Sequence, residues 1–360
     1  MTLSALAYIF SGLIGLVVGG ELLVRGAVDL AKLIRISPLV IGLTVVAFGT
    51  STPELAVSVR SVLSGNTGIS VGNILGSNIY NVLLVLGMTA LLTPLKASNQ
   101  LIRFDVPIMI LASGMTLGLS WDGVLTRLDG FALFLSLCAY SIWKLKEGRK
   151  QHHAQASNST EKTPEQVKQS IWTPFRSLLK LLLGLGLLSL GSWGLVIGGV
   201  SIATALGVSE LIIGLTIVAI GTSLPEIVTA IVSIKRGHQD MAMGNVVGSN
   251  LFNLLGVLGL TAIIAPQPIA IPQTALEFDM LVMVAVAMAC LPIFFSGKQI
   301  SRWEGGLFLF YFVVYTVFLI LDALGSQHLR TLTSVMVIFV IPITIITLIL
   351  TTYKGTRSQT

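Results

Sequence analysis

Long apolar runs separated by short polar segments are the dominant pattern of this chain. Most of these runs approach or exceed the roughly 20 residues that a helix needs to cross a bilayer, and nothing shows the ten-residue alternation of a membrane β-barrel. The pattern therefore predicts an all-α polytopic membrane protein. We expect eleven membrane-spanning helices, at residues 3–24, 38–62, 71–93, 105–120, 127–145, 177–200, 210–234, 243–265, 275–296, 303–322 and 331–352.

Two polar motifs each occur twice inside these apolar runs. The copies are GLTVVAFGTSTPE at 42–54 with GLTIVAIGTSLPE at 214–226, and GNILGSNIYN at 72–81 with GNVVGSNLFN at 244–253. The copies stay in phase without a gap, so that Thr50 corresponds to Thr222 and Glu54 to Glu226. The matches are concentrated in Gly, Thr, Ser, Pro, Glu and Asn rather than in Leu and Val, which indicates that a polar site is repeated.

The repeat divides the chain into two halves. Each half holds five predicted spans, and because five is an odd number, the second half enters the membrane from the opposite face. Inverted repeats of this kind place the substrate site of many secondary transporters at the repeat interface. We expect a first half at residues 1–146, a linker at 147–175, a second, inverted half at 176–322, and an eleventh spanning helix with a tail at 323–360.

The distribution of charge predicts the orientation. The charged fraction is 11%, against about 25% for soluble domains. If the N-terminus is outside, 19 of the 22 Lys and Arg residues lie on the cytoplasmic side, as the positive-inside rule requires. We therefore expect a multi-pass protein of the plasma (inner) membrane, with a cytoplasmic linker and C-terminus. This topology explains the net charge of +6 without a nucleic-acid partner, so membrane lipid is the expected surrounding.

Two further features of the chain bear on its surfaces. Glu21, Arg25 and Asp29 are spaced four residues apart near a membrane boundary, which favours an ion-paired face on a long first helix. The oligomeric state is left open by the sequence, which is compatible with a monomer.

Each copy of the first motif predicts a break in a spanning helix. Pro53 and Pro225 lack an N–H, and their rings crowd the carbonyls four residues earlier, at Gly49 and Gly221. In hydrocarbon, a freed carbonyl costs several kcal/mol unless it is satisfied. Broken helices therefore persist where they line a cavity or bind a ligand, and a bound cation would satisfy these carbonyls.

Glu54 and Glu226 are the candidate ligands for such a cation. Each follows a threonine, Thr50 or Thr222, by four residues, which places hydroxyl and carboxylate on one face wherever the helix persists. Carboxylates at mid-membrane depth are costly and usually face a polar interior. We therefore interpret both acids as parts of an ion site.

The second motif adds a polar stripe to each half. Its members recur every four residues, at Asn73, Ser77 and Asn81 and again at Asn245, Ser249 and Asn253. The GxxxG pairs Gly72/Gly76 and Gly244/Gly248 allow helices to approach closely. We interpret the serine and the last asparagine of each copy as ion ligands. Bonding between helices is an equal alternative for the other asparagines of the motif, which are Asn73, Asn78, Asn245 and Asn250.

Together the motifs form an oxygen-only ligand set. They supply two carboxylates, several hydroxyls, amide oxygens and freed carbonyls, without thiolate or imidazole. Ca²⁺ takes about 6 to 8 oxygen ligands in flexible geometry, whereas Mg²⁺ demands a tight octahedron. Two glutamates balance one Ca²⁺, and the same oxygens can host Na⁺, so competition for them would link the two fluxes. The sequence thus predicts Ca²⁺ and Na⁺ as transported ions, no cofactor and no enzymatic role.

At this point the motifs identify a family resemblance. GTSTPE with GNILGSNIYN, and GTSLPE with GNVVGSNLFN, resemble the paired alpha repeats of the Ca²⁺/cation antiporter superfamily, nearest its prokaryotic Na⁺/Ca²⁺ exchangers. The similarity covers about residues 1–322. It implies ten core helices around a midplane site, and exchange of Ca²⁺ for several Na⁺ by alternating access, for cytosolic calcium homeostasis. It also implies that the Gly-rich first and sixth spans slide across the core.

The resemblance also implies a role for each site residue. Glu54 and Glu226 would be the central Ca²⁺ ligands. Backbone carbonyls would come from Ala47, Thr50, Ala219 and Thr222; flanking Na⁺ sites from Ser51, Ser77, Ser223 and Ser249; and the middle of the site from Asn81 and Asn253. Some members have Asp at this middle position of the second repeat. Asn at both positions makes the middle less anionic, which bears on the coupling ion and on K⁺ dependence.

Other functions remain as alternatives. Exchange of H⁺ for Ca²⁺ would use Glu54 and Glu226 as proton carriers, but that branch usually has GNxxE where this chain has GTSxPE. K⁺-dependent Na⁺/Ca²⁺ exchange is a second alternative. A passive cation channel could be lined by the same oxygens. An intramembrane protease is disfavoured, because the chain lacks a His pair, a Ser/Lys dyad motif and a GxGD motif.

Overall fold

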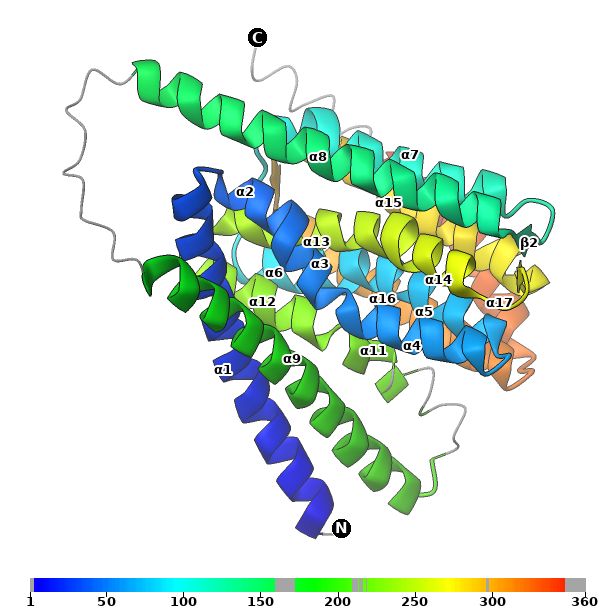
Figure 1. The fold of residues 1–360 in the computed structure, drawn as a ribbon. Coiled ribbons are helices and arrows are strands. Elements are labelled where there is room, and N and C mark those ends of the chain that lie inside the picture. The colour runs from blue at the N-terminus through cyan, green and yellow to red at the C-terminus, as the bar shows by residue number, and fades with distance from the viewer. Residues whose placement is uncertain are drawn as a thin grey trace.

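The computed structural model describes residues 3–158, 172–208, 213, 216–217, 219–295 and 298–346. Within these residues the chain is built almost wholly from helices, several of which contain wider π-helical segments, labelled η (Figure 1). The first half comprises α1 (Leu3–Ile34), α2 (Pro38–Ile41), η1 (Gly42–Val46), α3 (Ala47–Thr50), α4 (Thr52–Leu63), α5 (Thr67–Tyr80), η2 (Asn81–Leu86), α6 (Gly87–Leu92), β1 (Leu95–Lys96), η3 (Leu101–Asp105), α7 (Val106–Leu119), β2 (Val124–Leu125) and α8 (Arg127–Asn158).

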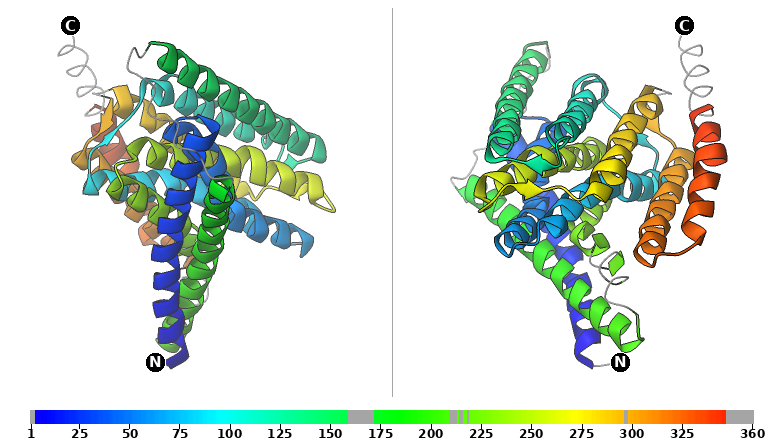
Figure 2. Two further views of the ribbon diagram at one scale, coloured as in Figure 1. Left: turned by 60° about the vertical axis from the view of Figure 1, so that its left-hand side comes forward. Right: turned by 90° about the vertical axis from the view of Figure 1, so that its right-hand side faces the viewer.

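The second half repeats this order of elements. It comprises α9 (Trp172–Ala205), α11 (Ala219–Thr222), α12 (Leu224–Lys235), α13 (Gln239–Leu251), η5 (Phe252–Leu258), α14 (Gly259–Ile264), β3 (Ile269–Ala270), η6 (Ala275–Asp279), α15 (Met280–Phe295), β4 (Gln299–Ile300) and α16 (Arg302–Ala323). The chain continues into α17 (His328–Val335) and η7 (Met336–Val340), which lie beside α16 at the edge of the molecule (Figure 2).

The expected helical membrane protein is confirmed at this level. Among the described residues, eight helices are long and apolar enough to cross a membrane, and the pair Pro38–Thr50 and Thr52–Leu63, bent by 40°, is a ninth candidate. Two predicted spans are not in this count. The span at 210–234 lies partly outside the described residues, and the one at 275–296 is formed by η6 and α15 in succession.

Two helices continue well beyond their apolar runs. Helix α1 extends through Asp29 to Ile34, and α8 extends to Asn158, so the described ends of the predicted linker at 147–175 are helical. A hydropathy pattern identifies only the apolar part of a helix, which lies in lipid or in the protein interior. The backbone hydrogen bonds continue into the polar residues that follow, where no Pro or Gly ends the helix.

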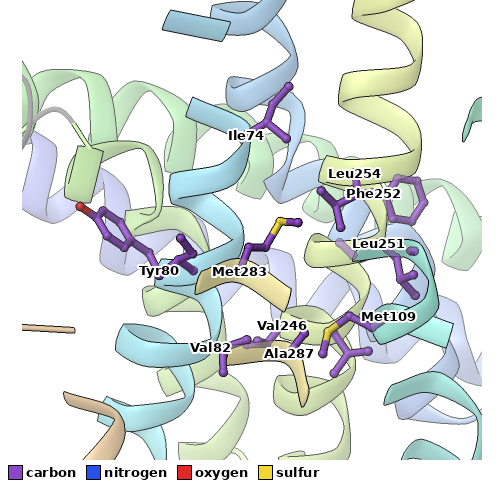
Figure 3. Packing of buried hydrophobic residues seen from close by; sticks show 14 of the residues in the cluster. Ile74, Tyr80, Val82, Met109, Val246, Leu251, Phe252, Leu254, Met283 and Ala287 are labelled. Carbon is purple, nitrogen blue, oxygen red and sulfur yellow. The ribbon is translucent and has the colours of Figure 1, made fainter. Parts of the chain in front are cut away.

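The centre of the molecule is made by the second motif and the residues after it. Helix α5 with η2, and α13 with η5, are the most deeply buried spans. In Figure 3, Ile74 and Val82 of the first half lie near Val246, Leu251 and Leu254 of the second. Met109 of α7 and Met283 of α15 complete this part of the core. The two halves therefore share one hydrophobic core.

Two short antiparallel ladders connect the halves. Strand β1 pairs with β4, with Leu95 opposite Ile300, and β2 pairs with β3, with Leu125 opposite Ile269. Each ladder thus takes one strand from each half. The backbone hydrogen bonds of each ladder therefore join a segment of the first half to a segment of the second half.

Helices α1 and α9 lie side by side over most of their length and project from the rest of the molecule (Figures 1 and 2). Glycines on both helices make this approach close. A Cβ added at Gly12 would lie 2.7 Å from the carbonyl oxygen of Gly191, and one added at Gly19 would lie 2.7 Å from the backbone nitrogen of Leu188. Larger side chains at these positions would force the two helices apart.

Candidate ion-binding site

Both copies of the first motif break at the serine before the proline. Helix α3 ends at Thr50 and α4 begins at Thr52, while α11 ends at Thr222 and α12 begins at Leu224. The intervening residues have nearly the same backbone, with φ −82° and ψ 2° at Ser51 and φ −88° and ψ 1° at Ser223. The predicted helix break is confirmed. Each proline falls in the first turn of the new helix, where its missing N–H is no loss.

The breaks place Glu54 and Glu226 in the first turns of α4 and α12. Unpaired N–H groups and the positive end of the helix dipole stabilise a carboxylate at this position. Both side chains are 1% exposed, and the two carboxylates are close enough for their charges to interact. Within the described residues, none of their four oxygens makes a hydrogen bond. Two acids from opposite halves therefore meet in the interior with their oxygens available to a ligand.

Thr50 connects the two motifs across the halves. Its hydroxyl donates to Oδ1 of Asn245 at 3.2 Å and lies 3.2 Å from the Ser249 hydroxyl. This contact needs α3 and η1 to pack closely on α13. A Cβ added at Gly248 would lie 2.7 Å from the backbone oxygen of Leu43 in η1, and one added at Gly244 would lie 2.7 Å from that of Leu39 in the preceding α2. The expected close approach is confirmed for this glycine pair, whereas a Cβ added at Gly72 or Gly76 would meet no atom of another element within 4 Å in the described part of the chain.

The middle positions coincide with π-helical segments. Asn81 begins η2, and Asn253 is the second residue of η5. Both side chains are buried, and within the described residues their amide groups make no hydrogen bond. A π-turn shifts the register of the side chains around a helix and is frequent at functional sites. Ser77 and Ser249, one turn earlier, are buried as well.

The remaining predicted residues lie along the broken helices. The hydroxyls of Ser51 and Ser223 are buried and lack a hydrogen-bond partner among the described residues. Ala47 begins α3 and is fully buried, whereas Ala219 begins α11, and Thr222, which ends it, is half-buried. The predicted residues are thus brought to the two helix breaks and the faces that pack on them.

Asn73 has a structural contact, which was one of its two expected roles. Its amide donates to the backbone oxygen of Glu54 at 3.2 Å and to the Ser58 hydroxyl at 3.0 Å. It therefore holds α5 against the first turn of α4. The carboxylate of Glu54 does not take part in these bonds.

Ser192 was not predicted as part of this site. Its hydroxyl, on α9, donates at 2.5 Å to the carbonyl oxygen of Gly221, which is the carbonyl that Pro225 frees. The projecting helix pair thus contacts the backbone of the break directly. No sequence pattern links Ser192 to Gly221, because the residues belong to different helices and the equivalent position in the first half is Gly20.

The chain is similar to known proteins over most of its length. A family model described as sodium/calcium exchanger protein matches residues 4–146 and 176–321. The inner membrane protein YrbG of Escherichia coli (strain K12) is 36% identical over 80% of this chain and 89% of YrbG. The sodium/calcium exchanger MaX1 of Methanosarcina acetivorans is 30% identical over 86% of this chain and 96% of MaX1. A structure of the sodium-calcium exchanger NCX_Mj soaked with Na⁺ and Sr²⁺ aligns with a TM-score of 0.75 and 30% identity, covering 88% of this chain and 99% of that one.

Proposed function

We propose that this chain, which belongs to the sodium/calcium exchanger protein family, exports Ca²⁺ from the cytosol in exchange for Na⁺. The observation that carries this proposal is the pair of buried carboxylates, one at each helix break, whose oxygens make no hydrogen bond within the described residues. Two negative charges match one Ca²⁺. Hard oxygen ligands without nitrogen or sulfur favour Ca²⁺ and Na⁺ over transition metals.

In the proposed site, the ligands divide between the two ions. Glu54 and Glu226 bind Ca²⁺ and are shared with Na⁺. Backbone carbonyls of Ala47, Thr50, Ala219 and Thr222 and the hydroxyls of Ser51, Ser77, Ser223 and Ser249 supply further oxygens, with Asn81 and Asn253 between them. The buried hydroxyls and amides that lack a partner in the described part of the chain support this set. Because both ions compete for the same carboxylates, release of one allows binding of the other.

We further propose two inverted five-helix repeats and an eleventh helix. The pairing of the strands supports the inversion. By position in the repeat, β1 corresponds to β3 and β2 to β4, yet β1 pairs with β4 and β2 with β3. Equivalent strands therefore lie in different ladders, as expected when one half enters the membrane from the opposite face. Alternating access would then move the α1–α9 pair across the core.

The proposed location is the inner membrane, with the N-terminus outside and the linker and C-terminus in the cytoplasm. The excess of Lys and Arg on the proposed cytoplasmic side supports this orientation. The direction of exchange follows from the ion gradients: a Na⁺ gradient directed into the cell would drive Ca²⁺ out of the cytosol.

The test is uptake of radiolabelled Ca²⁺ into proteoliposomes that contain the purified full chain. Vesicles loaded with Na⁺ and diluted into Na⁺-free medium should accumulate Ca²⁺, and an imposed membrane potential should change the rate if the exchange carries net charge. Vesicles loaded with choline are the control. Uptake that ignores the Na⁺ gradient would refute Na⁺ coupling; uptake driven by an acidic interior alone would identify H⁺ exchange, and a requirement for K⁺ beside Na⁺ would identify the K⁺-dependent type.

A further inference from the structure

A polar cavity separate from the candidate ion site lies where α1, α9 and the turn between α12 and α13 meet. Its volume is about 320 Å³, within the range of small-ligand sites, which is about 300–1,000 Å³. Six titratable side chains line it: Arg25, Asp29 and Lys32 of α1, Lys180 of α9, and Arg236 and His238 of the turn. We call this the basic pocket.

Positive charge exceeds negative charge in and around this pocket. Asp29 pairs with Lys180 at 2.8 Å, and Glu21, at the rim, pairs with both Arg25 and Arg236. Four permanent cations thus face two carboxylates. Lys32 is exposed and forms none of the ion pairs found among the described residues. An anion in the pocket can therefore pair with the ammonium group of Lys32. It can also accept hydrogen bonds from Arg25 and Arg236, because each guanidinium has five N–H donors and the ion pairs with Glu21 do not use all of them.

The pKa of His238 reflects the same excess of positive charge. Partial burial lowers its pKa, and the nearby charges of Lys32 and Arg236 lower it further. Both charges that act on this imidazole are thus positive. The local field in the pocket is therefore positive and attracts anions.

We infer that the basic pocket binds a phosphate group. Guanidinium and ammonium groups arranged around a cavity at the ends of membrane helices suit the phosphate of a lipid headgroup, and the same chemistry suits free phosphate. The pocket lies on the proposed cytoplasmic side, where anionic lipid is accessible from the leaflet. A phosphate bound here contacts α1, α9 and the α12–α13 turn together, and so ties the projecting helix pair to the core.

The test measures the thermal stability of the full-length protein in detergent, without Ca²⁺ or Na⁺, so that its outcome does not depend on transport. The ligands are short-chain phosphatidylglycerol, short-chain phosphatidylcholine and inorganic phosphate, at constant ionic strength set with choline chloride. We expect a saturable rise in Tm with phosphatidylglycerol and none with phosphatidylcholine. A rise with inorganic phosphate as well assigns the pocket to the phosphate group itself, and a rise with phosphatidylglycerol alone assigns it to the lipid.

Three variants locate the binding. Lys32→Gln should weaken the apparent affinity about fivefold, the factor that corresponds to one basic residue near an anionic partner. Lys32→Arg keeps the charge and should retain the affinity. Lys96→Gln removes an equal charge from an exposed side chain of β1, outside the pocket, and should also retain the affinity. Equal affinity in Lys32→Gln and Lys96→Gln, or no rise in Tm with either phosphatidylglycerol or inorganic phosphate, would show that the pocket is only an ion-pair network.

Discussion

At the scale of residues, the burial of Glu54 and Glu226 lowers the stability of the fold but serves the proposed ion binding. Each carboxylate benefits from a helix N-terminus, but within the described residues it makes no hydrogen bond, and a second carboxylate lies near it. Burial of charge without a partner destabilises a fold unless a ligand compensates. Such strained groups are typical of binding sites, where removing them stabilises the protein and abolishes its activity.

Replacing either acid by glutamine should therefore separate stability from transport. In buffer without Ca²⁺ or Na⁺, Glu54→Gln and Glu226→Gln should each raise the free energy of unfolding, by on the order of 1 kcal/mol, because one buried charge is removed. Ca²⁺ at 100 times its Kd should stabilise the unmodified protein by about 2.7 kcal/mol and each variant by much less. Thermal melts with and without Ca²⁺, combined with Ca²⁺ uptake, measure both effects.

Glu277→Gln is the matched control for this prediction. Glu277 is exposed on η6 and accepts a hydrogen bond only from Gln273 among the described residues. Its replacement should leave both the Ca²⁺-dependent stabilisation and the uptake unchanged. Full Ca²⁺ stabilisation in Glu54→Gln or Glu226→Gln would remove that residue from the proposed site.

Residues that the repeat contains could be predicted from the sequence, whereas contacts between different helices could not. The duplicated motif was enough to locate Glu54 and the break before it. The bond from Ser192 to Gly221 leaves no trace in spacing, and neither does the buried ion pair of Lys144 with Asp105. Such partners lie 29 and 39 residues apart (221 − 192 and 144 − 105) and meet only because of helix packing.

At the scale of elements, the glycines of α1 and α9 determine how closely the two helices can pack. A Cβ at Gly191 would lie 2.7 Å from both the Gly12 oxygen and the Leu16 nitrogen, which no side-chain rotation can relieve because both atoms belong to the backbone. Proposed sliding of this pair over the core requires it to move as a unit. The close glycine contact supplies the rigidity.

Gly191→Ala should therefore destabilise the pair and slow exchange. Overpacking of this kind typically costs about 1–3 kcal/mol. Gly186→Ala, on the same helix, is the control: Gly186 is exposed, and a Cβ added there would meet no atom of another element within 4 Å in the described part of the chain, so alanine should be neutral or stabilise the helix by about 0.5–1 kcal/mol. Thermal melts and initial rates of Na⁺-driven uptake compare the two. Similar behaviour of both variants would mean that the contact does not matter for the pair.

The elements also show where hydropathy stops being informative. The apolar runs located most of the spanning helices, but they could not place the end of α1 at Ile34 or of α8 at Asn158, because polar residues continue a helix as well as apolar ones do. The two strand ladders were not predicted. Each strand is two residues long, which is too short for a periodic pattern.

At the scale of the whole molecule, the proposed inversion places equivalent positions of the two halves on opposite sides of the membrane. Asn99 follows β1, and Gln273 occupies the equivalent place after β3. Both side chains are exposed. Inverted repeats place Asn99 in the cytoplasm and Gln273 outside, whereas repeats of the same orientation would place both on one side.

Single cysteines at these two positions test the inversion. In spheroplasts, a membrane-impermeant thiol reagent should label Gln273→Cys and not Asn99→Cys, and after permeabilisation it should label both. The unsubstituted protein is the blank, because its own cysteines, Cys138 and Cys290, lie within helices α8 and α15. Labelling of both variants, or of neither, in sealed spheroplasts would contradict the inversion. Labelling of Asn99→Cys alone would keep the inversion but reverse the proposed orientation, so that the linker and the C-terminus would lie outside.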